Sequence, residues 1–178
     1  AGTLTLSGTN TYAGVTTITQ GTLSVATIGN GGVAGNLGAA TNSVGNIVLN
    51  GGILSYTGST ASTDRGVTVN VTTNGEIDST TNTLTIATTG ITANGTLTIG
   101  GAGNTTISSV ISGAGGIAKT GAGTLTLSGT NTHTGVTTIT QGTLSVATIG
   151  NGGVAGNLGA ATNAVGNIVL NGGILSYT

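Results

Sequence analysis

Short runs in which apolar and polar residues alternate recur along the whole chain. In TLTLS (residues 3–7), the leucines point to one side of a strand and the threonines to the other, because strand side chains alternate with a period of two. Glycine or asparagine, which suit turns that need positive φ, opens or closes each run. The pattern predicts short strands joined by tight corners. Its expected inward residues are Leu4, Leu6, Val67, Val69, Val71, Leu84, Ile86, Leu97 and Ile99.

The strand pattern repeats at two levels. Residues 1–57 return at 122–178, so the longer period is 121 residues. Three positions differ between the copies: Tyr12 is His133, Ala13 is Thr134, and Ser43 is Ala164. Within one period the strand runs recur about every 20 residues, which describes the coils of a β-solenoid. At about 4.8 Å per coil, we expect about six coils and about 29 Å of rise per period.

An all-β solenoid fits the composition better than the alternative all-β architectures, a sandwich or a barrel. Only 3% of the residues are charged and 2% are aromatic, whereas about 25% are charged in typical globular domains. We therefore expect one continuous solenoid segment over 1–178, with a first copy at 1–121 and a partial second copy at 122–178. Residues 26–46 break the strand grammar and predict a loop or a larger excursion from the stack.

Charge and hydropathy exclude several classes of function. The net charge of −1 leaves no electrostatic footprint for nucleic acid or an anionic membrane. No apolar run approaches the 18 or so residues of a membrane span. The chain has no cysteine for disulfides or thiolate metal sites. Its few charged residues all lie between the repeated blocks: Asp64, Arg65, Glu76, Asp78 and Lys119.

One stretch resembles a known family. Residues 115–146 read GGIAKTGAGTLTLSGTNTHTGVTTITQGTLSV, with KTGAGTLTLSG, NTHTGVTT and GTLSV as the matching elements. They resemble the autotransporter-associated β-strand repeat in the passenger regions of large secreted bacterial surface proteins. The resemblance implies a right-handed parallel β-helix displayed outside a Gram-negative cell, as an adhesin or surface fibre. It supplies no catalytic residues.

Glycine-rich motifs invite a nucleotide or metal interpretation that other features oppose. Gly113–Thr120 is one glycine short of a P-loop, because Ala118 stands where the motif needs glycine. A strand signal follows it, not the helix whose N-terminus would hold phosphate. The Gly-x-Gly-x-x-Ala stretch at Gly29–Ala34 lacks a helix for the same reason. Asparagine replaces the acid of calcium-binding solenoid turns, and Asp64, Glu76 and Asp78 are too few for repeated calcium sites. We predict no cofactor and no metal site.

Catalytic constellations are also weak. Glu76 and Asp78 lie on one side of a strand, roughly 6–7 Å apart, a spacing compatible with acid/base cleavage of sugars. Basic partners and aromatic stacking residues are missing. His133 replaces a tyrosine of the other copy and is predicted to be a surface or corner side chain. Tyr12, Tyr56 and Tyr177 are predicted to pack at corners. We predict no catalytic residue and no enzymatic activity.

The leading functional prediction is a stiff extracellular solenoid that forms the body of a bacterial surface fibre, filament or giant adhesin. Its expected partners are further copies of its own repeat, in the same chain or end to end, with lateral association between rods that lack like-charge repulsion. The alternative is a binding module that uses Thr/Asn ladders on one face to bind a host surface, a glycan or, less readily, ice. Threonine also has high β-propensity, which explains the same residues without binding. The candidate segments are 3–5, 17–19, 96–98, 124–126 and 138–140.

Overall fold

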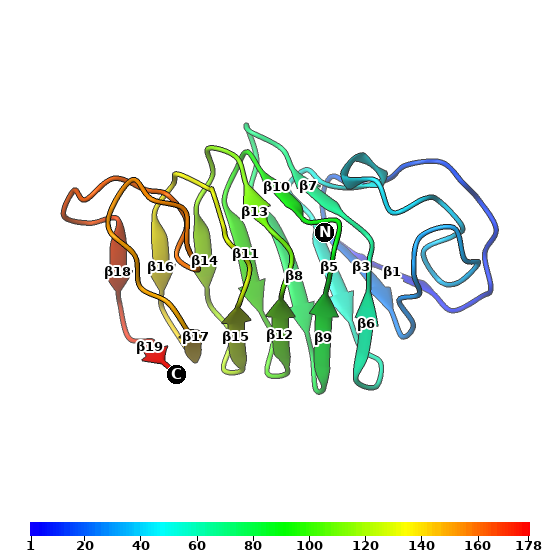
Figure 1. Ribbon diagram of the computed structural model, residues 1–178. Coiled ribbons are helices and arrows are strands. Elements are labelled where there is room, and N and C mark those ends of the chain that lie inside the picture. Colours follow the sequence, from blue (N-terminus) through cyan, green and yellow to red (C-terminus); the bar gives the residue numbers. More distant parts are fainter.

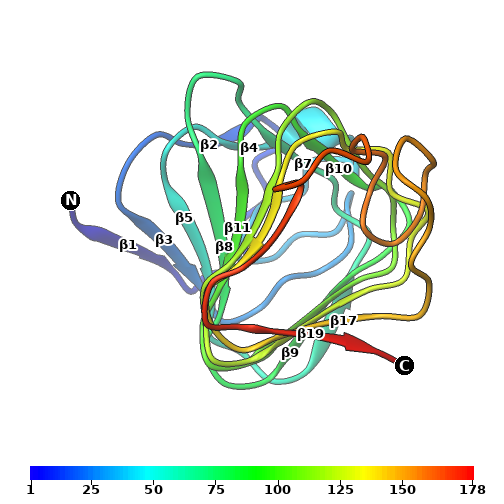
Figure 2. The same cartoon turned by 90° about the vertical axis from the view of Figure 1, so that its left-hand side faces the viewer.

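A computed structural model describes residues 1–178 and consists of short strands with a single 3-10 turn, η1 (Val44–Asn46). Every pairing between named strands is parallel. The strands stack along one axis (Figure 1), and the view along that axis shows three sides around a common interior (Figure 2). The predicted all-β, parallel β-solenoid is confirmed.

Three sheets form the sides of the tube, and Figure 1 labels most of their strands. The first sheet contains β1 (Thr3–Leu6), β3 (Thr22–Val25), β5 (Ile53–Tyr56), β8 (Gly75–Ser79), β11 (Leu97–Gly100), β14 (Ile117–Lys119), β16 (Thr137–Ile139) and β18 (Ile168–Leu170). The second sheet contains β2 (Thr16–Ile18), β4 (Ile47–Leu49), β7 (Val67–Val69), β10 (Ile91–Ala93) and β13 (Ile111–Ser112). The third sheet contains β6 (Ala61–Thr63), β9 (Thr83–Ile86), β12 (Asn104–Ile107), β15 (Thr124–Leu127), β17 (Thr143–Val146) and β19 (Ile174–Tyr177).

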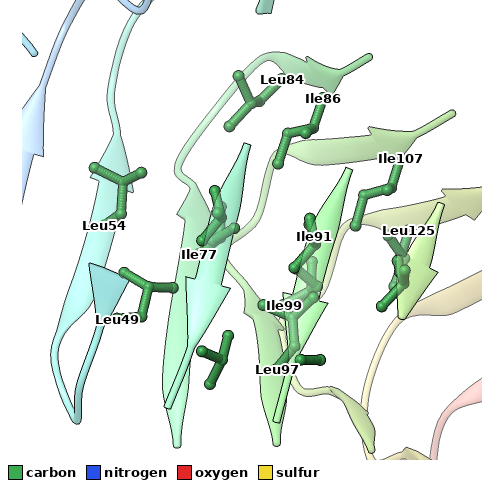
Figure 3. Close-up of a cluster of buried hydrophobic side chains, with 14 of the residues drawn as sticks. Leu49, Leu54, Ile77, Leu84, Ile86, Ile91, Leu97, Ile99, Ile107 and Leu125 are labelled. Atoms are coloured by element: carbon green, nitrogen blue, oxygen red, sulfur yellow. The ribbon is translucent and has the colours of Figure 1, made fainter. Parts of the chain in front are cut away.

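The interior consists of aliphatic columns in register from coil to coil. On the first sheet, Leu54, Ile77 and Ile99 follow one another inside the tube, and Figure 3 shows them among the buried side chains. A buried core of 26 residues runs through the tube. Each fully buried leucine or isoleucine contributes about 1.5–3 kcal/mol, so stacking supplies what a single coil cannot.

The predicted inward positions are confirmed with two exceptions. Val67, Val69, Leu84, Ile86, Leu97 and Ile99 are buried, and Leu6 packs partly buried against the core. Val71 is 74% exposed because β7 ends at Val69 and the chain turns before it. Leu4 is 61% exposed because β1 is the edge strand of the first sheet.

Identical sequences occupy different sides of the tube in the two copies. β1 lies in the first sheet, whereas β15, which has the same sequence, lies in the third. In the same way β2 lies in the second sheet and its counterpart β16 in the first. The chain passes the second, first and third sides in turn, so each copy is rotated by one side relative to the other.

This rotation corrects the expected number of coils per period. Sixteen steps from side to side separate β1 from β15, which is five and one-third coils, not six. The regular coils take 20 to 22 residues, since β8, β11 and β14 begin at residues 75, 97 and 117. The segment 26–46 is as long as a full coil, yet it spans only one of the three sides of the tube. The rise per copy is therefore about 26 Å.

Residues 26–46 form the predicted excursion, which leaves the tube between β3 and β4 on the third side. Their repeat, residues 147–167, leaves it between β17 and β18 on the second side. Each excursion is joined to the preceding coil by one antiparallel bridge, Asn10 with Gly35 and Asn131 with Gly156. The two excursions, called the first and second excursion below, therefore point away from the axis in different directions.

Candidate functional site

Arg65 holds the first excursion against the tube. Its side chain is only 2% exposed, and its guanidinium donates five hydrogen bonds of 2.8 to 3.3 Å to backbone carbonyls. The acceptors are the carbonyl oxygens of Gly29, Asn30, Val33, Gly38 and Ala40. Nε and Nη1 each donate to one carbonyl, and Nη2 shares its two hydrogens among three. Every nitrogen of the guanidinium, which has only donors, therefore has a partner.

Asp64 completes this clamp. Its carboxylate Oδ1 accepts a hydrogen bond of 2.7 Å from the backbone N–H of Gly31, and its own N–H donates to Asn30 Oδ1 at 3.1 Å. Burial lowers the pKa of Arg65, and the nearby Tyr12 and Asp64 oppose that shift. The Asp64–Arg65 pair is thus a structural tie between the coil of β6 and the excursion beneath it.

His133 lies inside the molecule, so the prediction of a surface or corner side chain is wrong. It is 0% exposed because the backbone N–H groups of Thr132 and His133 donate to Ile111 O and stack this segment on β13. Nε2 lies 3.5 Å from Thr137 Oγ1, and Nδ1 has no partner. Burial lowers the pKa of His133 to about 4, so the imidazole is neutral at pH 7.

The same ring position is used in both copies. Tyr12 OH lies 3.1 Å from Thr16 Oγ1, as His133 lies near Thr137. Gly38 (φ 67°) and Gly159 (φ 83°) lie against these rings, and a Cβ there would approach ring atoms to 2.7 Å and 2.6 Å. The ring and the glycine together seat each excursion on its coil. Among the other tyrosines, Tyr56 is buried at the end of β5 and donates to Ser59 O, whereas Tyr177 is exposed.

Lys119 also lies inside the tube. It follows Ile99 and precedes Ile139 in an inward column of the first sheet, and only 1% of it is exposed. Its Nζ donates to Gly121 O. Burial lowers the pKa of Lys119, and the charge of Asp78 opposes this. The strand that the sequence predicts after Lys119 is β15. Residues Gly113–Thr120 are therefore part of a solenoid coil, and the segment after them is not the helix that a P-loop requires.

Glu76 and Asp78 form a pair of close carboxyl groups on the outer face of β8. A Cβ on Gly100 would lie 2.1 Å from Asp78 Oδ1 and 2.4 Å from Glu76 Oε1, so both carboxyl groups lie over this one glycine of β11. Partial burial, the charge of Asp78 and a hydrogen bond to Asp78 raise the pKa of Glu76 to about 7. At neutral pH Glu76 is therefore protonated in part of the molecules.

We expect Glu76→Gln to stabilise the protein at pH 8 and to change little at pH 4. The pKa of Glu76 is about 7 in the folded protein against 4.5 for an unperturbed glutamate, so its stabilising contribution is complete below about pH 4.5 and is lost as the pH rises through 7. With solvent screening the loss is about 1–2 kcal/mol. Urea unfolding at pH 4 and pH 8 measures it. An equal effect of the substitution at both pH values would contradict the raised pKa of Glu76.

One side of the tube carries a continuous row of hydroxyl groups. On the third sheet, six outward hydroxyls follow one another in register, called the hydroxyl row below: Ser62, Thr85, Thr106, Thr126, Ser145 and Ser176. Of the five segments proposed from the sequence, only 124–126 contributes to it. Thr98 on the first sheet lies between Glu76 and Ala118, and Thr17 on the second sheet lies beside Val48.

Parts of the chain are similar to a known family of repeats. The family model described as passenger-associated-transport-repeat matches residues 1–25 and 117–146. Two segments of the chain therefore resemble the passenger-associated-transport-repeat. Its matched residues form β1 to β3 in the first copy and β14 to β17 in the second. The resemblance to passenger repeats described from the sequence is confirmed.

A relative of known name matches a short part of the chain. The chain is 57% identical over 53 residues to the protein named adhesin BmaC autotransporter of Brucella suis biovar 1 (strain 1330). The match covers 29% of this chain and 2% of the length of that relative. No solved structure matches the chain. The structure contains no helix with the length and apolar character needed to cross a membrane.

Proposed function

We propose that the chain is a stiff, non-enzymatic β-solenoid segment in the exported passenger of a bacterial surface protein of the adhesin type. The observation that supports this most strongly is that the matched passenger repeats are ordinary coils of one tube. In the second copy, the repeat strands β14 and β15 are hydrogen-bonded to coils on both sides. An element of this kind acts by holding a shape and a length.

The energetics of the tube support a mechanical role. Backbone hydrogen bonds run along the axis in three sheets, and aliphatic columns fill the space between them. Bending the tube would stretch ladder bonds and open the packed interior, which is as dense as a crystal in folded proteins. The buried Arg65, Lys119 and His133 contact the chain's own backbone or side chains, which favours structural roles for them.

Surface display is tested by labelling cells that express the full protein with an antibody against this segment. Equal labelling of intact and permeabilised cells is expected. Labelling only after permeabilisation would overturn the proposal.

Electron microscopy of the purified segment tests stiffness, since straight rods are expected and flexible coils would contradict a mechanical role. Rods that join end to end or side by side would identify further copies of the repeat as partners.

A second candidate function is binding through the hydroxyl row. Six in-register hydroxyls, about 4.8 Å apart along the axis, form a regularly spaced polar row that suits a regular ligand such as a polysaccharide or ice. Thr106→Val would interrupt this row, whereas Thr98→Val on the first sheet is the matched control. Binding to glycans, or a freezing-point gap, that is lost only with Thr106→Val would support this function. Absence of both activities in the unaltered protein would exclude these two ligands.

A further inference from the structure

The two excursions have the same internal structure. In the first, Asn36 Oδ1 accepts hydrogen bonds from two backbone N–H groups, those of Ala26 and Thr27, and the N–H of Gly32 donates to Ala40 O at 2.8 Å. In the second, Asn157 Oδ1 accepts from Ala147 and Thr148, and Gly153 donates to Ala161 O at 2.7 Å. The excursion therefore holds its shape by its own hydrogen bonds in both copies.

The second excursion lines an open pocket of about 310 Å³. Its lining includes Gly150, Asn151, Gly159 and Ala161, which are the counterparts of four of the five residues whose carbonyls accept from Arg65. In the first excursion the guanidinium of Arg65 occupies this position. The same carbonyl cage thus exists twice, filled by an arginine in one copy and open to solvent in the other.

The segment that covers the first excursion shows how the pocket would be closed. After Arg65, the N–H of Gly66 donates to Asn42 O at 2.9 Å, and Thr68 Oγ1 donates to Val44 O at 2.8 Å. The counterparts of Asn42 and Val44 are Asn163 and Val165, which line the pocket. Val165 is fully exposed to solvent. The exposed surface of the second excursion therefore includes the positions that residues 63–68 cover in the first excursion.

We propose that the second excursion is a binding site for an arginine side chain on a Thr-Asp-Arg segment, supplied by a further copy of this repeat. The arginine donates to the carbonyl cage, and the preceding aspartate accepts from the N–H of Gly152, as Asp64 does from Gly31. This site takes guanidinium in preference to ammonium, because a lysine has three donors where the cage presents five acceptors. The inference goes beyond the proposed surface role and does not depend on it.

The first arm of the test extends residues 1–178 with GSTASTDRGVTV, the sequence of residues 58–69, which continues the repeat in register after Thr178. Amide exchange at Gly153, Val154 and Gly159 is the measurement, with Gly32, Val33 and Gly38 as the internal reference. We expect exchange at the second excursion to slow by about tenfold or more, toward that of the first. An extension whose arginine is replaced by alanine should not produce this change.

The second arm adds the same sequence to the unextended protein as a free peptide. Replacing the peptide's arginine by alanine should weaken binding by about tenfold or more. Asn151→Ala should weaken binding too, because Asn30, its counterpart, accepts from the Asp64 N–H. Asn30→Ala is the matched control and should leave peptide affinity unchanged.

The two arms distinguish the sources of the arginine. Protection by the extension alone assigns the site to the following coil of the same chain. Binding of the peptide as well shows that a second molecule can also fill it. If the arginine and alanine versions behave alike in both arms, the proposal is overturned, because the segment would then bind by strand pairing without the cage.

Discussion

Replacing Arg65 with alanine is expected to lower the free energy of unfolding by about 2–4 kcal/mol. The side chain is buried and donates to five carbonyl oxygens of the first excursion. Alanine would leave the carbonyls of Val33 and Gly38 without a protein donor. The other three acceptors would each lose one of two donors, because Thr63 Oγ1, the Val33 N–H and the Gly32 N–H also donate to them. Water can enter the space and satisfy part of them, which limits the loss. Urea unfolding measures the stability, and amide exchange at Gly32 and Gly38 shows whether the excursion has loosened.

Arg65→Lys is the control for charge. Lysine keeps the positive charge but offers three donors in place of a planar fork of five, so an intermediate loss is expected. The second excursion provides an internal reference, because exchange at Gly153 and Gly159 should not change. A loss below about 0.5 kcal/mol, the range of ordinary surface substitutions, would show that Arg65 does not hold the excursion.

The sequence predicts the coil and its inward columns because both follow from alternation and repetition. It also contained the signal that places Arg65 and Lys119 inside. Arg65 has the same parity as Thr63 and Val67 in its strand run, and Lys119 the same parity as Ile117; all of them are buried. Neither charged side chain was expected inside the tube, since lysine and arginine are almost never fully buried unless paired. The backbone carbonyls that accept their hydrogen bonds come from turns and excursions whose shape the alternation does not describe.

The rotation between copies was not predictable from the period of 121 residues. It depends on how many sides of the tube each segment spans. The segment 26–46 spans one side, although it is as long as a full coil. The burial of His133 was hidden for a related reason. Its exposure is decided by the coil that contains β13, which lies beneath it in space and has no counterpart in the comparison of one copy with the other.

One consequence of the rotation is that neighbouring excursions cannot stack on one another. The first leaves the third side and the second leaves the second side, about 26 Å further along the axis. In a longer array of the same repeat, an excursion would return to its side after sixteen coils, or about 77 Å. In such an array, each carbonyl cage would therefore be closed by the coil directly above it and not by the next excursion.

His133→Tyr is expected to make the protein more resistant to acid. The pKa of His133 is about 4 in the folded protein against 6.5 for an unperturbed histidine, so the unfolded chain binds more protons between these values. Stability is then complete above about pH 6.5 and falls by about 3 kcal/mol as the pH drops to 4. Tyrosine cannot gain a proton in this range. Its ring has a precedent in Tyr12, which contacts Gly38 and Thr16 as His133 contacts Gly159 and Thr137.

The measurement must separate His133 from Glu76, whose stabilising contribution grows as the pH falls from 7 to 4.5. The two effects oppose each other in overlapping ranges, so the unaltered protein should show a shallow profile. Urea unfolding from pH 7 to pH 4 is therefore compared between Glu76→Gln and the double variant with His133→Tyr. The single variant should lose stability steeply and the double variant should not. Parallel profiles would mean that the buried imidazole gains its proton without loosening the coil.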